Sequence, residues 1–134
     1  MMKAIRIHDQ AAGRDVLAFD LRDLLSALGP RADRAIWRVG KVKGEFMVTG
    51  DDAADELESL AGSETPVSGR RLRKISRHVR QTIFGEFKGY EKASSADPWI
   101  IVIAYDSTWF EVQSRDEAAL DRLKVTFKDV RQVP

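Results

Sequence analysis

Several short segments of the chain alternate apolar and polar residues, which is the pattern of half-buried β-strands. Residues 4–8 alternate in this way, and residues 16–19 can return antiparallel to them in an N-terminal hairpin. Residues 35–50 read as two strands, with Lys43–Gly44 as the turn that joins them. The first third of the chain is therefore expected to form antiparallel strand pairs.

Three further strands are predicted in the second half of the chain, at residues 84–90, 99–105 and 109–113. The segment 99–105 is apolar at every position and so on both faces, which places it in the middle of a sheet. Only a short link separates it from residues 109–113, so these two strands are expected to pair antiparallel.

Four segments instead space their apolar residues three and four positions apart, as one face of a helix requires. They are residues 21–28 with Asp20 as N-cap, residues 51–62, residues 68–83, and a last helix that starts at a Ser114–Glu117 capping box and runs toward Phe127. Hairpins and helices therefore interleave along the chain, which is typical of the α+β class.

We expect one globular domain over residues 1–134, because no linker, repeat or low-complexity tract divides the chain. Its predicted architecture is a largely antiparallel sheet of about five or six strands, with helices packed mainly on one face.

The composition excludes several classes of chemistry. The 22 Lys and Arg residues against 21 Asp and Glu residues leave a formal net charge of +1, which creates no overall field for nucleic acid or an anionic membrane. Because cysteine is absent, disulfides, thiolate nucleophiles and thiolate metal sites are excluded. No apolar run approaches the roughly 18 residues of a membrane span, and the N-terminus lacks a signal-peptide core, so a soluble cytoplasmic protein is expected.

The helix predicted over residues 68–83 separates cationic from aliphatic side chains. Its cationic face consists of Arg70, Arg73, Lys74, Arg77 and Arg80. Guanidinium groups match phosphate and carboxylate oxygens, so this face suits a nucleic-acid backbone, an acidic protein surface or an anionic lipid headgroup. The ordinary alternative is a solvated helix face whose charge is balanced by acids of the preceding helix.

The corner Asp106-Ser107-Thr108 joins the last two predicted strands. Asp and Ser stabilise turns through side-chain bonds to nearby amides, which explains the corner without catalysis, and the glycines of a nucleophile elbow are missing around Ser107. Beyond the corner, alternation sends Trp109 and Glu111 to the face opposite Phe110. Trp109, with Glu111 beside it, is a candidate binding anchor unless a helix or a neighbouring strand covers it.

Motifs for metals and cofactors are missing. His8 and His78 are the only histidines, and they lie on different predicted elements. The glycine-rich sequences that cradle phosphates are absent as well. We therefore expect no catalytic residues, no metal and no cofactor.

Residues Pro98–Arg131, PWIIVIAYDSTWFEVQSRDEAALDRLKVTFKDVR, resemble the C-terminal third of a group of small, mostly uncharacterised bacterial proteins. The resemblance lies in the Pro-Trp strand, the Asp-Ser corner, the Asp-Glu helix start and the FKDVR ending. Some proteins of this group look like immunity-type proteins, which neutralise a toxin. The resemblance contains no catalytic motif, so it implies a non-enzymatic binding module.

Three functions are consistent with these features. The first is protein–protein recognition of an accessory or immunity type, with a toxin-like protein or a second copy as partner, through the cationic helix face or the hairpin around Trp109. The second is nucleic-acid binding through the basic helix 70–80. The third is a small-molecule-binding protein or enzyme with a pocket between the sheet and the helices.

Overall fold

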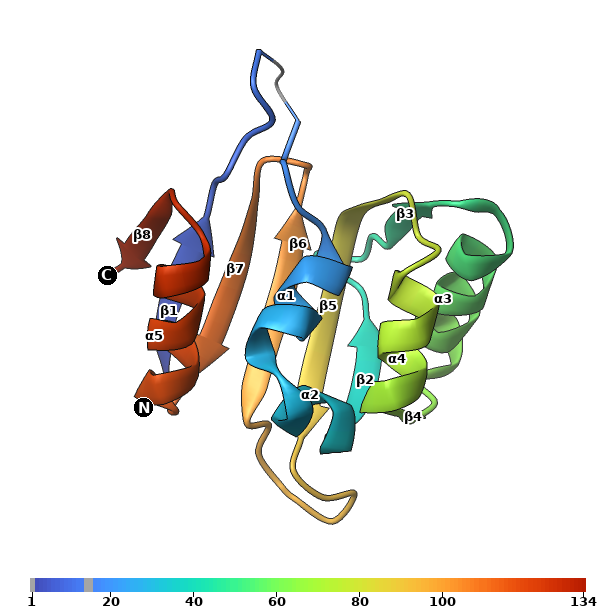
Figure 1. Cartoon of the computed structure of the whole chain (residues 1–134). Coiled ribbons are helices and arrows are strands. Elements are labelled where there is room, and N and C mark those ends of the chain that lie inside the picture. Colours follow the sequence, from blue (N-terminus) through green and yellow to red (C-terminus); the bar gives the residue numbers. More distant parts are fainter. Residues whose placement is uncertain (1, 14–15) are drawn as a thin grey trace.

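A computed structural model describes residues 2–13 and 16–134, in which strands and helices alternate irregularly along the chain (Figure 1). The strands are β1 (Lys3–Ile7), β2 (Ile36–Gly40), β3 (Met47–Thr49), β4 (Val67–Ser68), β5 (Gln81–Tyr90), β6 (Ile100–Tyr105), β7 (Trp109–Ser114) and β8 (Val130–Val133). The helices are α1 (Leu21–Leu28), α2 (Pro30–Arg34), α3 (Asp51–Ser63), α4 (Gly69–Ser76) and α5 (Glu117–Thr126).

One antiparallel sheet contains all the strands, in the order β4-β2-β5-β6-β7-β1-β8, with β3 paired to the remaining part of β5. The strand β6 lies in the middle, as its apolar sequence predicts. The turn between β6 and β7 is closed by the amide of Thr108, which donates to the carbonyl of Tyr105 at 2.9 Å. The structure is thus α+β with an antiparallel sheet, as expected.

The two faces of the sheet differ in burial. On one face Val102 of β6 and Phe110 of β7 are fully buried, in the same apolar cluster as Leu24 of α1 and Leu123 of α5. Figure 1 shows α1, α2, α4 and α5 in front of this face. The alternate positions, such as Ile103, point the other way and are only half-buried.

The sheet has eight strands, so the expected five or six was too low, and the difference lies at the sheet edges. The strands β4 and β8 have two and four residues, too few for their alternation to stand out in the sequence. The strands β2 and β3 lie within residues 35–50 as predicted, but each pairs with β5 and not with the other. The Lys43–Gly44 turn closes only a single bridge, because the ten-residue β5 provides partners for both strands end to end.

The predicted N-terminal hairpin is also reduced to one bridge, between Gln10 and Leu17. Strand β1 instead pairs with β7 on one side and β8 on the other, so its partners come from the far end of the chain. Arg14 and Asp15, in the link of the expected hairpin, lie outside the described residues.

The basic helix predicted over residues 68–83 is wrong in its second half. Helix α4 ends at Ser76, whose hydroxyl donates to the carbonyl of Arg73 at 2.8 Å. The amides of His78 and Val79 then bond only three residues back. The amide of Arg80 then donates to the carbonyl of Thr49 at 2.7 Å. Pairing with β3 therefore replaces the next helical turn, and the β-branched and aromatic residues that follow extend as β5.

Candidate functional site

The side of the sheet that faces away from the helices is called the open face here. It consists of Ala4, Arg6, Ile36, Arg38, Phe84, Glu86, Lys88, Tyr90, Ile101, Ile103, Tyr105, Trp109, Glu111, Gln113, Arg131 and Val133, which share one side by strand alternation and register. None of its apolar residues belongs to the buried cluster or is packed against it. The open face is therefore a second apolar surface outside the core.

A row of aromatic rings crosses the open face at one end of the central strands. Phe84, Tyr105 and Trp109 lie directly opposite one another on β5, β6 and β7. The rings of Tyr105 and Trp109 stack, with their centroids 4.9 Å apart and their planes 16° apart, and Phe84 meets Tyr105 edge-on at 5.7 Å. Trp109 is thus half-buried, and it lies outside the buried cluster to which the helices contribute.

Arg6 flanks Trp109 on the side away from Tyr105, because β7 lies between β6 and β1. Its guanidinium carbon is 4.6 Å from the Trp109 ring centroid, and its Nε donates to Glu111 at 2.9 Å. The other carboxylate oxygen of Glu111 accepts from Gln113 at 2.6 Å. The predicted residues Trp109 and Glu111 are therefore joined through Arg6, which the sequence analysis did not select.

Positive charge exceeds negative charge on the open face. The cations are Arg6, Arg38, Lys88 and Arg131, with Lys43 next to the face at 5.2 Å from the Tyr105 ring. Three of them form ion pairs: Arg6 with Glu111 at 2.9 Å, Lys88 with Glu86 at 3.4 Å and Arg131 with Asp129 at 3.0 Å. Burial, together with the charges of Arg131 and Arg6, lowers the pKa of nearby His8 against the opposing effect of Asp129, so His8 is neutral at pH 7. Among the described residues, the excess charge is therefore carried by Arg38 and Lys43, which form no ion pair.

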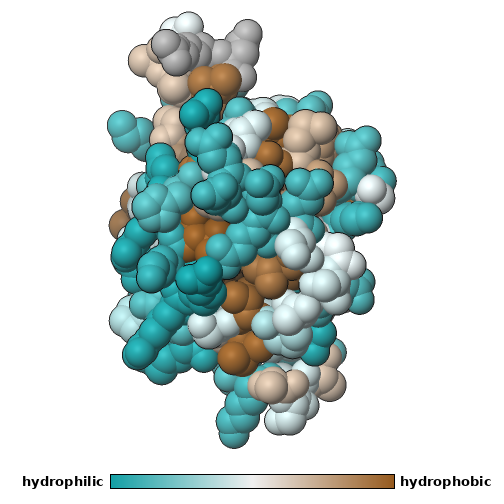
Figure 2. All heavy atoms as spheres, turned by 90° about the vertical axis from the view of Figure 1, so that its right-hand side faces the viewer, coloured by the Kyte–Doolittle hydropathy of each residue, from teal (hydrophilic) through white to brown (hydrophobic). Residues whose placement is uncertain are grey.

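The apolar row continues to one edge of the sheet through Met47, which lies opposite Phe84 and is 48% exposed. Met47 and Phe46 also line a hollow of about 480 Å³ beside Ala61 of α3. Figure 2 faces this side of the molecule and shows apolar atoms in a broken strip between hydrophilic residues. Apolar surface thus reaches from the open face to the edge next to α3.

The five predicted basic residues lie away from the open face. The apolar side of α4, with Leu72 and Ile75, is buried in the core beneath the opposite face of the sheet. Arg73 is half-buried and donates to Asp33 at 3.0 Å. Arg70, Lys74, Arg77 and Arg80 are exposed and have no ion pair within residues 2–13 and 16–134. The structure therefore separates the basic residues from Trp109 and Glu111.

No protein-family model, curated protein or solved structure matches this chain. Its function is therefore inferred from its own side chains. Among the described residues, no three His, Asp or Glu side chains are grouped as a metal site needs, and no helix in that part of the chain is long and apolar enough to cross a membrane.

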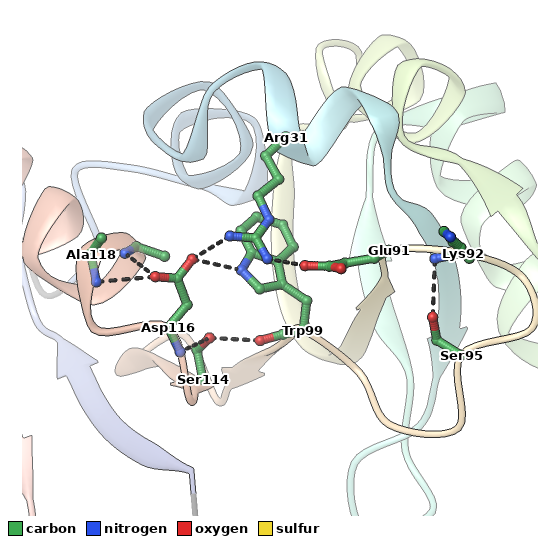
Figure 3. A network of polar contacts seen from close by, with 9 residues as sticks. Arg31, Glu91, Lys92, Ser95, Trp99, Ser114, Asp116 and Ala118 are labelled. Carbon is green, nitrogen blue, oxygen red and sulfur yellow. Dashed lines mark hydrogen bonds and ion pairs between the residues drawn. The ribbon is translucent and has the colours of Figure 1, made fainter.

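A polar network that the sequence analysis missed joins α2 to the start of α5 (Figure 3). Arg31 lies over the ring of Trp99, 4.4 Å from its centroid, and forms ion pairs with Asp116 at 2.5 Å and with Glu91. Asp116 also accepts from the Trp99 indole at 3.1 Å. The charged groups of this network are thus paired with one another, which indicates a structural role.

Asp116 is the N-cap of α5, in place of the predicted Ser114, and accepts from the amides of Ala118 and Ala119. Burial by itself would raise the pKa of Asp116, but the bonds from Trp99 and these amides and the charge of Arg31 outweigh burial and lower it. The carboxylate therefore stays ionised and holds the helix start in place.

Replacing Ser114 by alanine is expected to lower the free energy of unfolding by about 1–3 kcal/mol. The fully buried Ser114 hydroxyl donates to the carbonyl of Trp99 at 2.6 Å and accepts from the amide of Asp116 at 3.0 Å, so the substitution leaves two backbone groups without a partner. Urea unfolding of Ser114→Ala beside Ser59→Ala, at an exposed position of α3, measures the difference. Equal stabilities of the two variants would show that the network contributes little.

Proposed function

We propose that the protein is a non-enzymatic binding module that holds an acidic partner protein against the open face. The observation that carries this proposal is the apolar surface of Ile101, Ile103 and Tyr105 on the central strand, which is only partly buried and lies outside the core. Monomeric proteins rarely expose large contiguous apolar patches, and such patches mark interaction surfaces. A partner would complete the burial of this sheet on its second face.

Charge supports an acidic partner. Arg38 and Lys88 lie directly opposite each other on β2 and β5, next to the aliphatic residues of β6. Carboxylates placed around an apolar patch on the partner would complement these cations and keep other proteins away. A second copy of this chain would bring cations against cations, which disfavours self-association through this face.

Ring geometry supports a protein over single-stranded nucleic acid at this surface. Bases stack on aromatic side chains whose flat faces are free. The two sides of Trp109 are occupied by Tyr105 and Arg6, so the outward-facing parts are ring edges and aliphatic groups. Such groups suit apolar side chains of a protein. In this proposal the protein acts in the bacterial cytoplasm as an accessory or immunity-type protein, with an acidic, toxin-like protein as the partner.

Charge reversal tests the proposal. The Arg38→Glu/Lys88→Glu variant is expected to weaken partner binding at least tenfold, because it replaces two positive charges by two negative charges opposite an acidic surface. The matched control is Arg70→Glu/Lys74→Glu, which changes the net charge by the same amount at two exposed positions of α4. The tagged chain captures proteins from cells of its source, mass spectrometry identifies them, and calorimetry with the purified partner gives Kd for each variant.

Three outcomes would contradict this function. The captured partner could be basic, the α4 control could lose binding as strongly as the open-face variant, or nucleic acid could be retained and released with a steep salt dependence. Sedimentation of the chain alone supplies a further check, since a dimer that the open-face variant abolishes would assign the surface to a second copy.

A further inference from the structure

A cavity of about 240 Å³ lies beside the turn between β6 and β7, at the end of the sheet away from the Arg31 network. Ser107 of that turn lines the cavity, and its hydroxyl accepts from Gln81 at 3.0 Å. Arg22 of α1 and Arg80, just before β5, also contribute to the lining. The turn therefore borders a concave polar site, although nothing in its sequence indicates a catalytic serine.

Among the described residues of the lining, the two arginines are the only cationic side chains, and they come from different elements. Within the described residues neither guanidinium has an ion-pair partner, and Arg22 makes only a long bond of 3.5 Å to the carbonyl of Val79. Two like charges around one hollow repel each other unless an anion lies between them. The planar guanidinium fits a carboxylate through two parallel hydrogen bonds.

Asp20 limits the charge that such an anion can carry. It lines the cavity, is 6% exposed, and accepts from the amide and the hydroxyl of Thr82 at 2.9 and 2.7 Å. Both carboxylate oxygens act as acceptors, which is the pattern of the ionised form. Two arginines and one aspartate give the described residues of the lining a charge of +1, so a ligand with one negative charge balances it better than a dianion.

The rest of the lining indicates a short apolar tail on the ligand. Leu17 and Phe19 form an apolar wall, with Val16 39% exposed at its margin. The cavity is smaller than the roughly 300–1,000 Å³ of sites for drug-sized ligands. We infer that this cavity binds a small monocarboxylate with a short aliphatic tail, independently of the partner proposed for the open face.

Titration of the ¹⁵N-labelled chain with sodium butyrate, followed by NMR, tests this site. Saturable shifts are expected for the amides of Arg22, Thr82 and Ser107. Acetate is expected to bind up to about tenfold more weakly, because it lacks the methylene groups that contact the apolar wall. Phosphate, largely a dianion at pH 7.5, is expected to bind more weakly than butyrate. Sodium chloride keeps ionic strength equal in every titration.

Two variants in the cavity and one control variant make the result specific. Arg80→Gln is expected to weaken butyrate binding at least tenfold, and Arg22→Gln to act in the same direction, whereas Arg77→Gln removes an equally exposed arginine outside the cavity and leaves binding unchanged. Shifts that do not saturate, equal losses in Arg80→Gln and Arg77→Gln, or phosphate binding more tightly than butyrate would each overturn the inference. The Arg38→Glu/Lys88→Glu variant should bind butyrate normally, so this result does not depend on the open face.

Discussion

Replacing Gly69 by alanine is expected to lower the free energy of unfolding by about 3 kcal/mol or more, a large part of the roughly 5–15 kcal/mol typical of a folded domain. Gly69 opens α4 and touches the end of α2. A Cβ atom at this position would lie 1.9 Å from the carbonyl oxygen of Ala32 and 2.7 Å from that of Asp33. Both obstacles are backbone atoms, so no side-chain rotation relieves the clash.

Helices α2 and α4 can therefore approach this closely only because residue 69 has no side chain. The amide of Gly69 donates to the carbonyl of Ala35 at 2.8 Å, and moving α4 outward would break this bond and loosen Leu72 and Ile75 in the core. The cost therefore combines the lost bond with lost packing.

The control for this prediction is Gly62→Ala in α3, where an added Cβ meets nothing within 4 Å. Alanine favours helix over glycine by about 1 kcal/mol, so Gly62→Ala is expected to be neutral or slightly stabilising. Thermal and urea unfolding of both variants measures the contrast. Similar stabilities for Gly69→Ala and Gly62→Ala would mean that the two helices can separate without loss.

Much of the fold follows from local pattern, whereas strand partners do not. Helix α1 can be predicted because its leucines repeat at helical spacing, and strand β6 can be predicted because it is an unbroken apolar run of six residues. Strand β8 and the split pairing of β2 and β3 depend on β1 and on the length of β5, which are distant in the chain. The prediction of a helix over residues 68–83 is wrong in its second half for the same reason, because the amide of Arg80 donates to a carbonyl of β3, which is distant in the chain.

The candidate site shows the same division. Alternation places Trp109 and Glu111 on one face, but the strand order β6-β7-β1 is needed to bring Arg6 between them and to stack Tyr105 on the other side. The cavity beside Ser107 joins residues about 60 to 90 positions apart, such as Asp20 and Thr82, and no local motif connects them. Contacts between side chains that only the strand order brings together cannot be predicted from the spacing of residues in the sequence.

Replacing Asp20 by alanine is expected to lower the free energy of unfolding by about 3 kcal/mol. The change removes the N-cap of α1 and leaves the buried amide and hydroxyl of Thr82 without acceptors. Asp23→Ala is the matched control, since its carboxylate is half-buried and accepts one bond, from the amide of Asp20 at 2.8 Å. Urea unfolding should show a loss of about 1 kcal/mol or less for the control.

The difference between wild type and Asp20→Ala should also depend on pH in a direction that identifies the group. Burial raises the pKa of Asp20 above its ordinary value of 3.8, although the two bonds from Thr82 oppose this. Between the ordinary and the raised pKa, the folded protein binds more protons than the unfolded chain, so the contribution of Asp20 to stability falls as pH rises through this window. Asp116, whose pKa is lowered, acts in the opposite direction but is present in both proteins and cancels from their difference.

The stability advantage of wild type over Asp20→Ala should therefore be largest at acidic pH, decline as pH rises above about 3.8, and level off once Asp20 is ionised in the folded state. An advantage that grows with pH through this range would show that the bonds from Thr82 outweigh burial. In that case Asp20 would stabilise the fold in its ionised form, as an N-cap carboxylate at the start of α1 ordinarily does.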